Sequence, residues 1–259
     1  MQNTIGAFAL ASVLAAGGPA FAQDTPAKPT IVLVHGAFAD SSGWNSVIAD
    51  LNKEGYSTIA AANPLRSVAG DAASVAAIVK SISGQVVLVG HSYGGLVITE
   101  AANGNPNVKA LVYVAAFLPE QGESAGILSS RFPGSTLGDS LHPVALGDGG
   151  QDLYIEAEKF HAQFAADVPE DVTSLMAQTQ RPVTAAALSD LAGEAAWKSL
   201  PTYLIYGSAD MNIPVAVQTF MADRAHAVKA VELDGASHAL MISRPAEVSA
   251  LIKEAATAQ

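Results

Sequence analysis

The chain has 259 residues, of which half are apolar, 13 are basic and 24 are acidic, and it contains no cysteine. The net charge of −11 and the lack of a Lys/Arg cluster argue against binding to nucleic acid or to anionic membrane surfaces. The lack of cysteine excludes disulfides, thiolate metal sites and a cysteine nucleophile.

The first 22 residues have the pattern of a secretory signal peptide. An apolar run over residues 5–16 is too short to span a bilayer comfortably and ends at the helix breaker Gly17-Gly18-Pro19. Ala20-Phe21-Ala22 fits the small-x-small cleavage pattern, although residues 1–4 carry no Lys or Arg. We expect export, to the periplasm or the medium, after cleavage near Ala22. The alternative is an ordinary apolar N-terminal helix.

From residue 30 onward, short β-branched runs alternate with helix-like segments. Continuous apolar strands indicate burial on both faces, and their alternation with helices indicates right-handed βαβ crossovers. The expected strands are 30–34, 57–61, 85–89, 108–115, 202–206 and 229–233. The expected helices are 41–54, 71–83 (with Asp71 as N-cap), 94–103, 215–225 and 245–256. The pattern predicts an α/β fold with a mostly parallel, doubly wound sheet.

The alternation breaks between residues 120 and 197. This stretch has few β-branched runs, many Gly and Pro residues, and helix-like patches at 151–166 and 170–178. Long insertions between core strands are where lids and substrate-binding elements are found. We expect a core made of residues 23–119 and 198–259, with a helical cap of residues 120–197 inserted between core strands.

Ser92 is the predicted nucleophile. It lies in Gly90-His91-Ser92-Tyr93-Gly94-Gly95, between a strong strand and a helix, which is the setting that a nucleophile elbow requires. Small residues two before and two after the serine avoid clashes in a strained turn. The turn also places the Tyr93 N–H at a helix N-terminus, where it can stabilise an oxyanion.

A serine hydroxyl needs a general base, and His238 is the predicted one because it follows the last strand. Among the other five histidines, His91 is expected to point away from the site and His226 to lie on the surface, while His142 and His161 belong to the insertion. Asp210, which follows the strand 202–206, is the predicted acid that orients the base. Its rivals are Glu120, Glu123 and Asp234.

The loop after the first strand, His35-Gly36-Ala37-Phe38, is expected to supply a second oxyanion donor, the N–H of Ala37. We expect His35 to be structural, with hydrogen bonds inside the loop. Phe38, Phe117 and Leu118 are the candidate substrate-binding residues, and Trp44 and Tyr93 are further candidates for the pocket wall. Core packing explains each of these apolar side chains equally well.

Taken together, these segments resemble the α/β-hydrolase superfamily, and within it the branch of plant methylesterases, hydroxynitrile lyases and related bacterial esterases. The resemblance covers residues 30–257 and extends to Gly207-Ser208-Ala209-Asp210, Ser237-His238-Ala239 and the cap stretch from Val168 to Pro182. It implies a triad of Ser92, Asp210 and His238, an oxyanion hole from Ala37 and Tyr93, and no metal or other cofactor. Hydroxynitrile lyases of this branch carry a Lys after the catalytic His, where this chain has Ala239. Haloalkane dehalogenases and epoxide hydrolases have Asp in place of Ser92.

The sequence therefore predicts a carboxylesterase that cleaves small esters through an acyl-enzyme intermediate. The same triad would also serve a lactonase, an amidase, a perhydrolase or a C–C hydrolase. A ligand-binding sensor that retains the triad is the alternative from another class. The sequence leaves the acyl and alcohol preference and the oligomeric state open.

Overall fold

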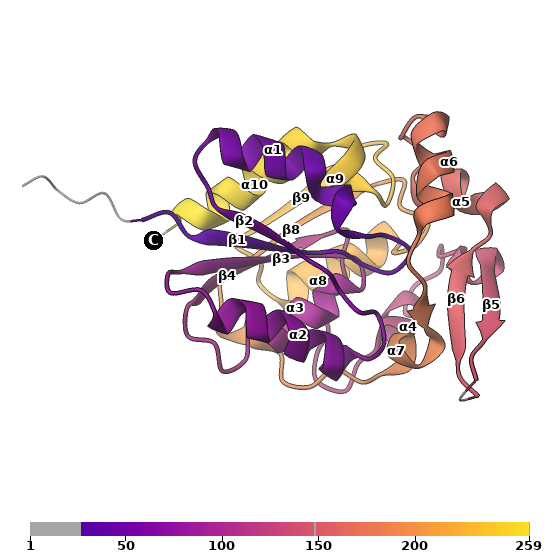
Figure 1. The fold of residues 1–259 in the computed structure, drawn as a ribbon, viewed down its shortest axis with the longest axis horizontal. Helices are drawn as coiled ribbons and strands as arrows, with labels where there is room; N and C mark the ends of the chain where they lie inside the picture. The colour runs from indigo at the N-terminus through magenta and orange to yellow at the C-terminus, as the bar shows by residue number, and fades with distance from the viewer. Residues whose placement is uncertain (1–26, 148, 259) are drawn as a thin grey trace, which may run out of the picture.

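The computed structural model describes residues 27–147 and 149–258, so the predicted signal peptide lies outside the described residues. Six strands form one parallel sheet in the order β2-β1-β3-β4-β8-β9 (Figure 1). The strands are β1 Thr30–Val34, β2 Thr58–Ala61, β3 Val86–His91, β4 Val108–Val114, β8 Thr202–Gly207 and β9 Lys229–Leu233. Every residue of β3 and β8 is buried, as their continuous apolar runs predicted.

Helices cover both faces of this sheet. Figure 1 shows α1 and α10 on one face and α2 and α3 on the other. The core helices are η1 Ser41–Trp44, α1 Asn45–Lys53, α2 Val68–Lys80, α3 Gly94–Ala101, α8 Val215–Arg224, α9 Leu240–Ser243 and α10 Pro245–Thr257. The predicted α/β fold with a parallel, doubly wound sheet is confirmed. No helix among the described residues is both long and apolar enough to cross a membrane.

Helix α2 begins earlier than expected, and the prediction of Asp71 as its N-cap is wrong. Ser67 caps the helix: its backbone is extended, and its hydroxyl accepts a hydrogen bond from the Gly70 N–H. Asp71 instead lies inside the first turn and is fully buried. Its carboxylate accepts the hydroxyl of Tyr93 at 2.8 Å, next to the predicted nucleophile.

The insertion forms a cap at the end of the sheet where the strands terminate (Figure 1). Its helices are α4 Ala125–Ser129, η2 Leu137–Ser140, α5 Ala157–Phe164, α6 Glu170–Thr179, α7 Ala185–Ser189 and η3 Ala196–Lys198. In addition to the expected helices, the cap holds an antiparallel sheet in the order β5-β6-β7. These strands are β5 Leu141–Ala145, β6 Gln151–Ile155 and β7 Val183–Thr184.

Strand β6 replaces the first third of the helix expected at 151–166. Its last residues, Leu153, Tyr154 and Ile155, are aromatic or branched and pair with β5, an arrangement that these side chains favour. Gly149 takes a φ of 88° in the connection between the two strands, where a glycine is needed. The helix α5 then begins after Glu156.

Candidate active site

Ser92 lies between the end of β3 and the start of α3, in the predicted elbow. Its φ of 53° lies in the left-handed region that a serine rarely adopts. The backbone around it is held by core strands, since the Ser92 N–H donates to the Val114 carbonyl and the Ser92 carbonyl accepts from Phe117. A strained serine at the junction of a strand and a helix is typical of a nucleophile elbow.

The glycines around Ser92 are required by close backbone contacts. A Cβ on Gly94 would lie 2.6 Å from the Val34 carbonyl oxygen, and one on Gly95 would lie 2.0 Å from the Phe117 carbonyl oxygen. On Gly90 it would meet the Gly94 carbonyl oxygen at 2.6 Å. No real side chain tolerates such distances, so these positions accept only glycine.

His238 and Asp210 form a buried pair. The Nδ1 of His238 and Oδ2 of Asp210 are 2.7 Å apart, and both residues are almost fully buried. The other carboxylate oxygen of Asp210 accepts the backbone N–H groups of Asn212 and Ile213, at 2.8 and 2.9 Å. The carboxylate therefore accepts the Nδ1 proton, which leaves Nε2 of the neutral imidazole as the atom that can take a proton.

The loops that carry this pair meet in the core. A Cβ on Gly207 would lie 2.0 Å from the Ala236 carbonyl oxygen, and the same oxygen accepts the Ala209 N–H at 3.0 Å. The rival acids lie elsewhere in hydrogen bonds of their own. Glu120 pairs with Lys198, Glu123 with Arg224, and Asp234 with the hydroxyl of Ser208.

Contacts with His91 bring His238 to the elbow. Nε2 of His91 donates to the His238 carbonyl at 3.1 Å, and the two ring centroids are 4.7 Å apart. Nε2 of His238 is buried and has no hydrogen-bond partner among the described residues, so it is not bonded to the Ser92 hydroxyl in this conformation. Catalytic hydrogen bonds are often long in free enzymes and shorten when substrate binds.

His91 itself differs from the expectation that it points away from the site. It is fully buried, and its ring packs edge-on against Trp44 and Phe164 as well as tilted against His238. Burial lowers the pKa of His91 well below its usual range, and the neighbouring His238 adds to this. His91 is thus a neutral link between the elbow and the loop of the base.

The loop after β1 packs directly on the elbow. A Cβ on Gly36 would lie 2.6 Å from Cβ of Ser92, so only glycine fits there. Within the part of the chain that the structure describes, the N–H groups of Ala37 and Tyr93 donate to no protein acceptor. The next N–H, that of Phe38, is already used by the Arg181 carbonyl of the cap at 3.0 Å. Two free amides thus flank Ser92, as an oxyanion hole requires.

His35 has the structural role that we expected. Its Nδ1 contacts the Gly36 carbonyl at 2.9 Å, and its Nε2 accepts the Asn63 N–H at 3.1 Å. Burial lowers its pKa, in keeping with this neutral tautomer. The remaining histidines stay away from the pair: His142 and His226 are exposed, and His161 contacts Thr173 within the cap.

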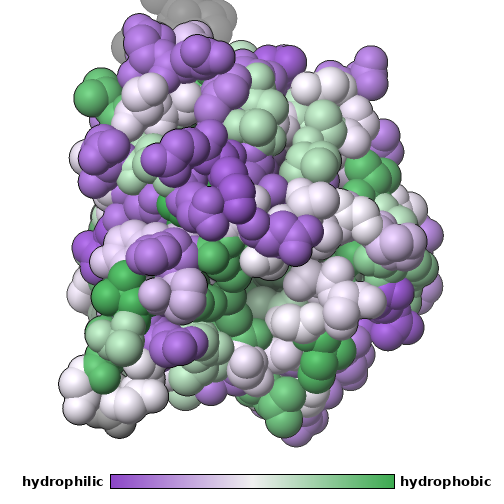
Figure 2. Space-filling view, turned by 90° about the vertical axis from the view of Figure 1, so that its right-hand side faces the viewer, coloured by the Kyte–Doolittle hydropathy of each residue, from purple (hydrophilic) through white to green (hydrophobic). Residues whose placement is uncertain are grey.

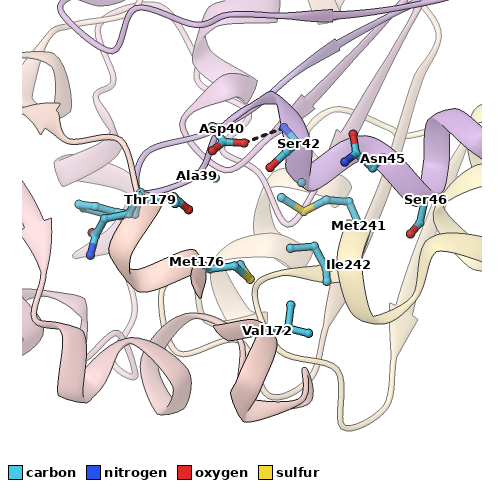
Figure 3. Close-up of a pocket in the computed structure, with 13 residues that line it drawn as sticks. Ala39, Asp40, Ser42, Asn45, Ser46, Val172, Met176, Thr179, Met241 and Ile242 are labelled. Atoms are coloured by element: carbon cyan, nitrogen blue, oxygen red, sulfur yellow. Dashed lines mark hydrogen bonds between the residues drawn. The ribbon is translucent and has the colours of Figure 1, made fainter. Parts of the chain in front are cut away.

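A pocket of about 170 Å³ opens beside the loop after β1, between η1, α6 and α9 (Figure 3). Figure 2 faces the cap side of the molecule and shows apolar residues around a hollow. The pocket is lined by Phe38, Ala39, Asp40, Ser42, Gly43, Asn45, Ser46, Val172, Met176, Thr179, Gln180, Met241 and Ile242. Phe38 is thus a wall of this pocket, whereas Phe117 and Leu118 are buried and do not line it. Their contact with substrate stays a prediction.

Sequence reasoning missed the cap residues that contact the pair. Phe164 of α5 packs edge-on against the His238 ring at 5.1 Å between centroids. Gln163, beside it, is buried and bonded to the segment that follows Asp210. Phe160, Gln163 and Phe164 follow the spacing of one helical face, and Asp167 lies just after the end of α5. A polar residue on an otherwise apolar face was the signal that could have identified Gln163.

Comparisons with known proteins agree with this architecture. The model of the alpha/beta hydrolase family matches residues 31–251. An alpha/beta hydrolase of Aspergillus novofumigatus is 29% identical over 253 residues, covering 88% of this chain and 97% of its own length. The pyrethroid hydrolase of Sphingobium wenxiniae is 28% identical over 250 residues, with 88% of each chain covered.

A third relative, methylesterase 7 of Arabidopsis thaliana, is 26% identical over 258 residues and covers 90% of this chain and 98% of its own. Among solved structures, polyneuridine aldehyde esterase superposes with a TM-score of 0.77 at 20% identity, covering 88% of this chain and 99% of its own. That likeness concerns the fold. The family match spans most of the sequence, and the chain therefore belongs to the alpha/beta hydrolase family.

Proposed function

We propose that this enzyme is a carboxylesterase that hydrolyses small esters with Ser92 as nucleophile, His238 as general base and Asp210 as the acid that orients it. One observation carries the proposal. A buried His–Asp pair with a free Nε2 is joined through His91 to the elbow, where the strained Ser92 is flanked by two unpaired backbone amides. Relatives named pyrethroid hydrolase and methylesterase support an ester substrate.

The chemistry follows from these positions. His238 Nε2 takes the hydroxyl proton as Ser92 Oγ attacks the ester carbonyl carbon, and the Ala37 and Tyr93 amides stabilise the oxyanion. The bond to the alcohol oxygen breaks, and His238 returns the proton to the leaving alcohol. Water then attacks the acyl-enzyme, again losing a proton to His238, which releases the acid and restores Ser92. Each oxyanion donor in such sites lowers the activation free energy by about 3 kcal/mol.

Ser92→Ala tests this directly. We expect the kcat for p-nitrophenyl acetate to fall by about 10⁴-fold or more, while circular dichroism and the unfolding midpoint stay near those of the wild type. Ser81→Ala, which removes an exposed hydroxyl at the C-terminal end of α2, is the matched control. A fluorophosphonate followed by peptide mass spectrometry should label Ser92 in the wild type. Turnover by Ser92→Ala at the wild-type rate would refute the proposal.

The pocket beside Phe38 supports an apolar group on the acyl or alcohol side of the ester. Val172, Met176, Met241 and Ile242 give it an apolar wall, and cavities of about 150 Å³ accept a benzene-sized group. Met176→Trp would fill this space. We expect it to raise the KM for esters with a longer-chain or aromatic acyl group or alcohol about tenfold, and to change the KM for methyl acetate by less than twofold. Equal effects on both esters would show that the pocket lies outside the substrate path.

For the N-terminal segment, we infer export from the sequence pattern alone. N-terminal sequencing of the chain secreted by its host should then begin at Gln23. A start at Met1 in an intracellular fraction would contradict this.

A further inference from the structure

Gln163 makes an unusually complete set of contacts for a cap residue. Its side chain is 7% exposed, and both ends of its amide are used. Nε2 donates to the Met211 carbonyl at 3.0 Å and to Asn212 Oδ1 at 2.7 Å. Oε1 accepts the hydroxyls of Thr136 at 2.8 Å and Ser140 at 3.1 Å. Because a carbonyl can only accept, the orientation of the amide is fixed.

The segment that Gln163 holds is the one that orients Asp210. We call residues 210–213 the acid turn. Within it, the N–H groups of Asn212 and Ile213 donate to one carboxylate oxygen of Asp210, and the other oxygen contacts His238. An unbroken series of hydrogen bonds therefore leads from the cap amide, through Asn212, to the carboxylate and the imidazole.

The same part of the cap also holds the loop of the base. Phe164 packs edge-on against the His238 ring. Asp167, just after α5, accepts the hydroxyl of Ser237 and lies 3.4 Å from the Arg244 guanidinium. Neighbouring residues of one cap segment thus contact both the acid turn and the residues around the base.

We propose that Gln163 is a positioning residue of the hydrolase, which acts through the acid turn to hold the Asp210 carboxylate against His238. The inference rests on the proposed function, because it assigns a task to the Asp210–His238 pair. It also gives the cap a role in chemistry besides covering substrate. Without the Gln163 amide, Asn212 Oδ1 loses its donor and the Met211 carbonyl keeps only the Thr136 N–H. The turn can then rotate away from the imidazole.

Gln163→Met is the sharpest variant, since it keeps the length of the side chain and removes every hydrogen bond. We expect kcat/KM for p-nitrophenyl acetate to fall about 10- to 100-fold, mainly through kcat, as for a misplaced catalytic group. A close carboxylate favours the protonated imidazole. The acidic limb of the pH–rate profile should therefore move to lower pH.

The pH readout separates positioning from packing, because lost stability alone does not move a pH–rate profile. The titratable groups that face His238 or its neighbour Ser237 are Asp210, His91 and the Asp167–Arg244 pair, and Gln163→Met leaves all of them in place.

The matched control is Asn107→Leu. The Asn107 amide donates to three backbone carbonyls at the opposite end of the sheet. The Asn107→Leu enzyme should therefore lose stability while its pH–rate profile stays unchanged.

Asn212→Ala keeps the test decisive if Gln163→Met does not fold. It removes one acceptor of the amide, and we expect the same direction of change with a smaller loss of kcat. Where Gln163→Met does fold, the double variant should lose less than the product of the two single losses, since both act on one series of contacts. Full additivity, or wild-type rates and profiles in both single variants, would overturn the inference. Fluorophosphonate labelling of Ser92 in the wild type shows separately whether the proposed function holds.

Discussion

The elbow around Ser92 and the loops of Asp210 and His238 are held in different ways. At the elbow, the contacts come from the core sheet and from the segment that follows β4. The Val34 and Phe117 carbonyls lie against the glycines, and the Val114 carbonyl accepts the serine N–H. The structure of the elbow follows from a strand, a turn and a helix that are adjacent in sequence. None of these backbone contacts involves a residue of the cap.

Asp210 and His238, the proposed acid and base, are by contrast held from the cap as well. Gln163 bonds to the acid turn, Phe164 and Asp167 contact His238 and Ser237, and the Arg181 carbonyl accepts the Phe38 N–H of the loop after β1. The proposed nucleophile is thus fixed by the core, whereas its proposed partners also depend on the inserted cap. Changes in the two regions should have different consequences.

The largest effect is expected where the elbow is tightest. Gly95→Ala places a methyl group 2.0 Å from the backbone carbonyl oxygen of Phe117, a residue whose own N–H is bonded to the Ser92 carbonyl. We expect a loss of about 3 kcal/mol in the free energy of unfolding, measured by urea titration. Gly84→Ala, whose added Cβ has nothing within 4 Å, should change stability by less than about 0.5 kcal/mol. Equal losses would show that the packing around Gly95 adapts.

A second test concerns the boundary between the two regions, where His91 bonds to the His238 carbonyl. Burial lowers the pKa of His91 below the value of about 6.5 that it has when unfolded. At a pH between these two pKa values, only the unfolded chain binds the proton. The contribution of His91 to the free energy of unfolding is therefore complete above pH 6.5 and is lost as the pH falls toward the folded-state pKa. Each pKa unit of lowering corresponds to about 1.4 kcal/mol.

Urea unfolding at pH 7.5 and pH 5.5 checks this sign. His91→Gln can still donate to the carbonyl and does not titrate, so its stability should depend less on pH than that of the wild type. The slope that remains should come partly from His35, whose pKa is also lowered by burial. A steeper dependence in His91→Gln than in the wild type would contradict the buried neutral imidazole.

A smaller effect is expected where the elbow meets α2. The hydroxyl of Tyr93 donates to the buried carboxyl of Asp71. Burial raises the pKa of this carboxyl, and the hydrogen bond from Tyr93 opposes that rise. Tyr93→Phe should cost about 2 kcal/mol of unfolding free energy, because hydrogen bonds to charged groups are the stronger ones. Tyr113→Phe is the matched control: its partner Thr99 still donates to Gly95, so the loss should stay near 1 kcal/mol. A reversed order of the two losses would show that Asp71 finds another donor.

The same contrast explains what could be predicted from the sequence. The parallel sheet, the elbow and the positions of Asp210 and His238 after their strands depend on local periodicity and on turn residues, which a single sequence displays. Gln163 meets Asn212, and Asp167 meets Ser237, across 49 and 70 residues of chain. No local pattern encodes such pairings. The short cap strands were missed for a similar reason, since β6 is stabilised by its partners β5 and β7.

The smallest effect should arise where the cap is anchored away from α5. Arg66 bonds through one nitrogen to Asp152 of β6 at 2.6 Å and through another to the Pro182 carbonyl at 2.7 Å. Its side chain is 43% exposed, so Arg66→Ala should cost less than about 1 kcal/mol of global stability. Hydrogen exchange should nevertheless quicken in β6 and β7, because these strands lose one of their links to the core and keep the bonds of Thr184 to the Leu65 and Arg66 carbonyls. Arg66→Lys should not restore the slow exchange, since an ammonium cannot replace the planar fork. The hydrogen-exchange rates in α5 should stay within twofold of the wild type, because Arg66→Ala leaves the contacts of Gln163 and Asp167 in place. The value of kcat/KM should also stay within twofold. If α5 opened together with β6 and β7, the cap would move as one body, and the position of the acid and base would depend on the whole insertion instead of on one helix.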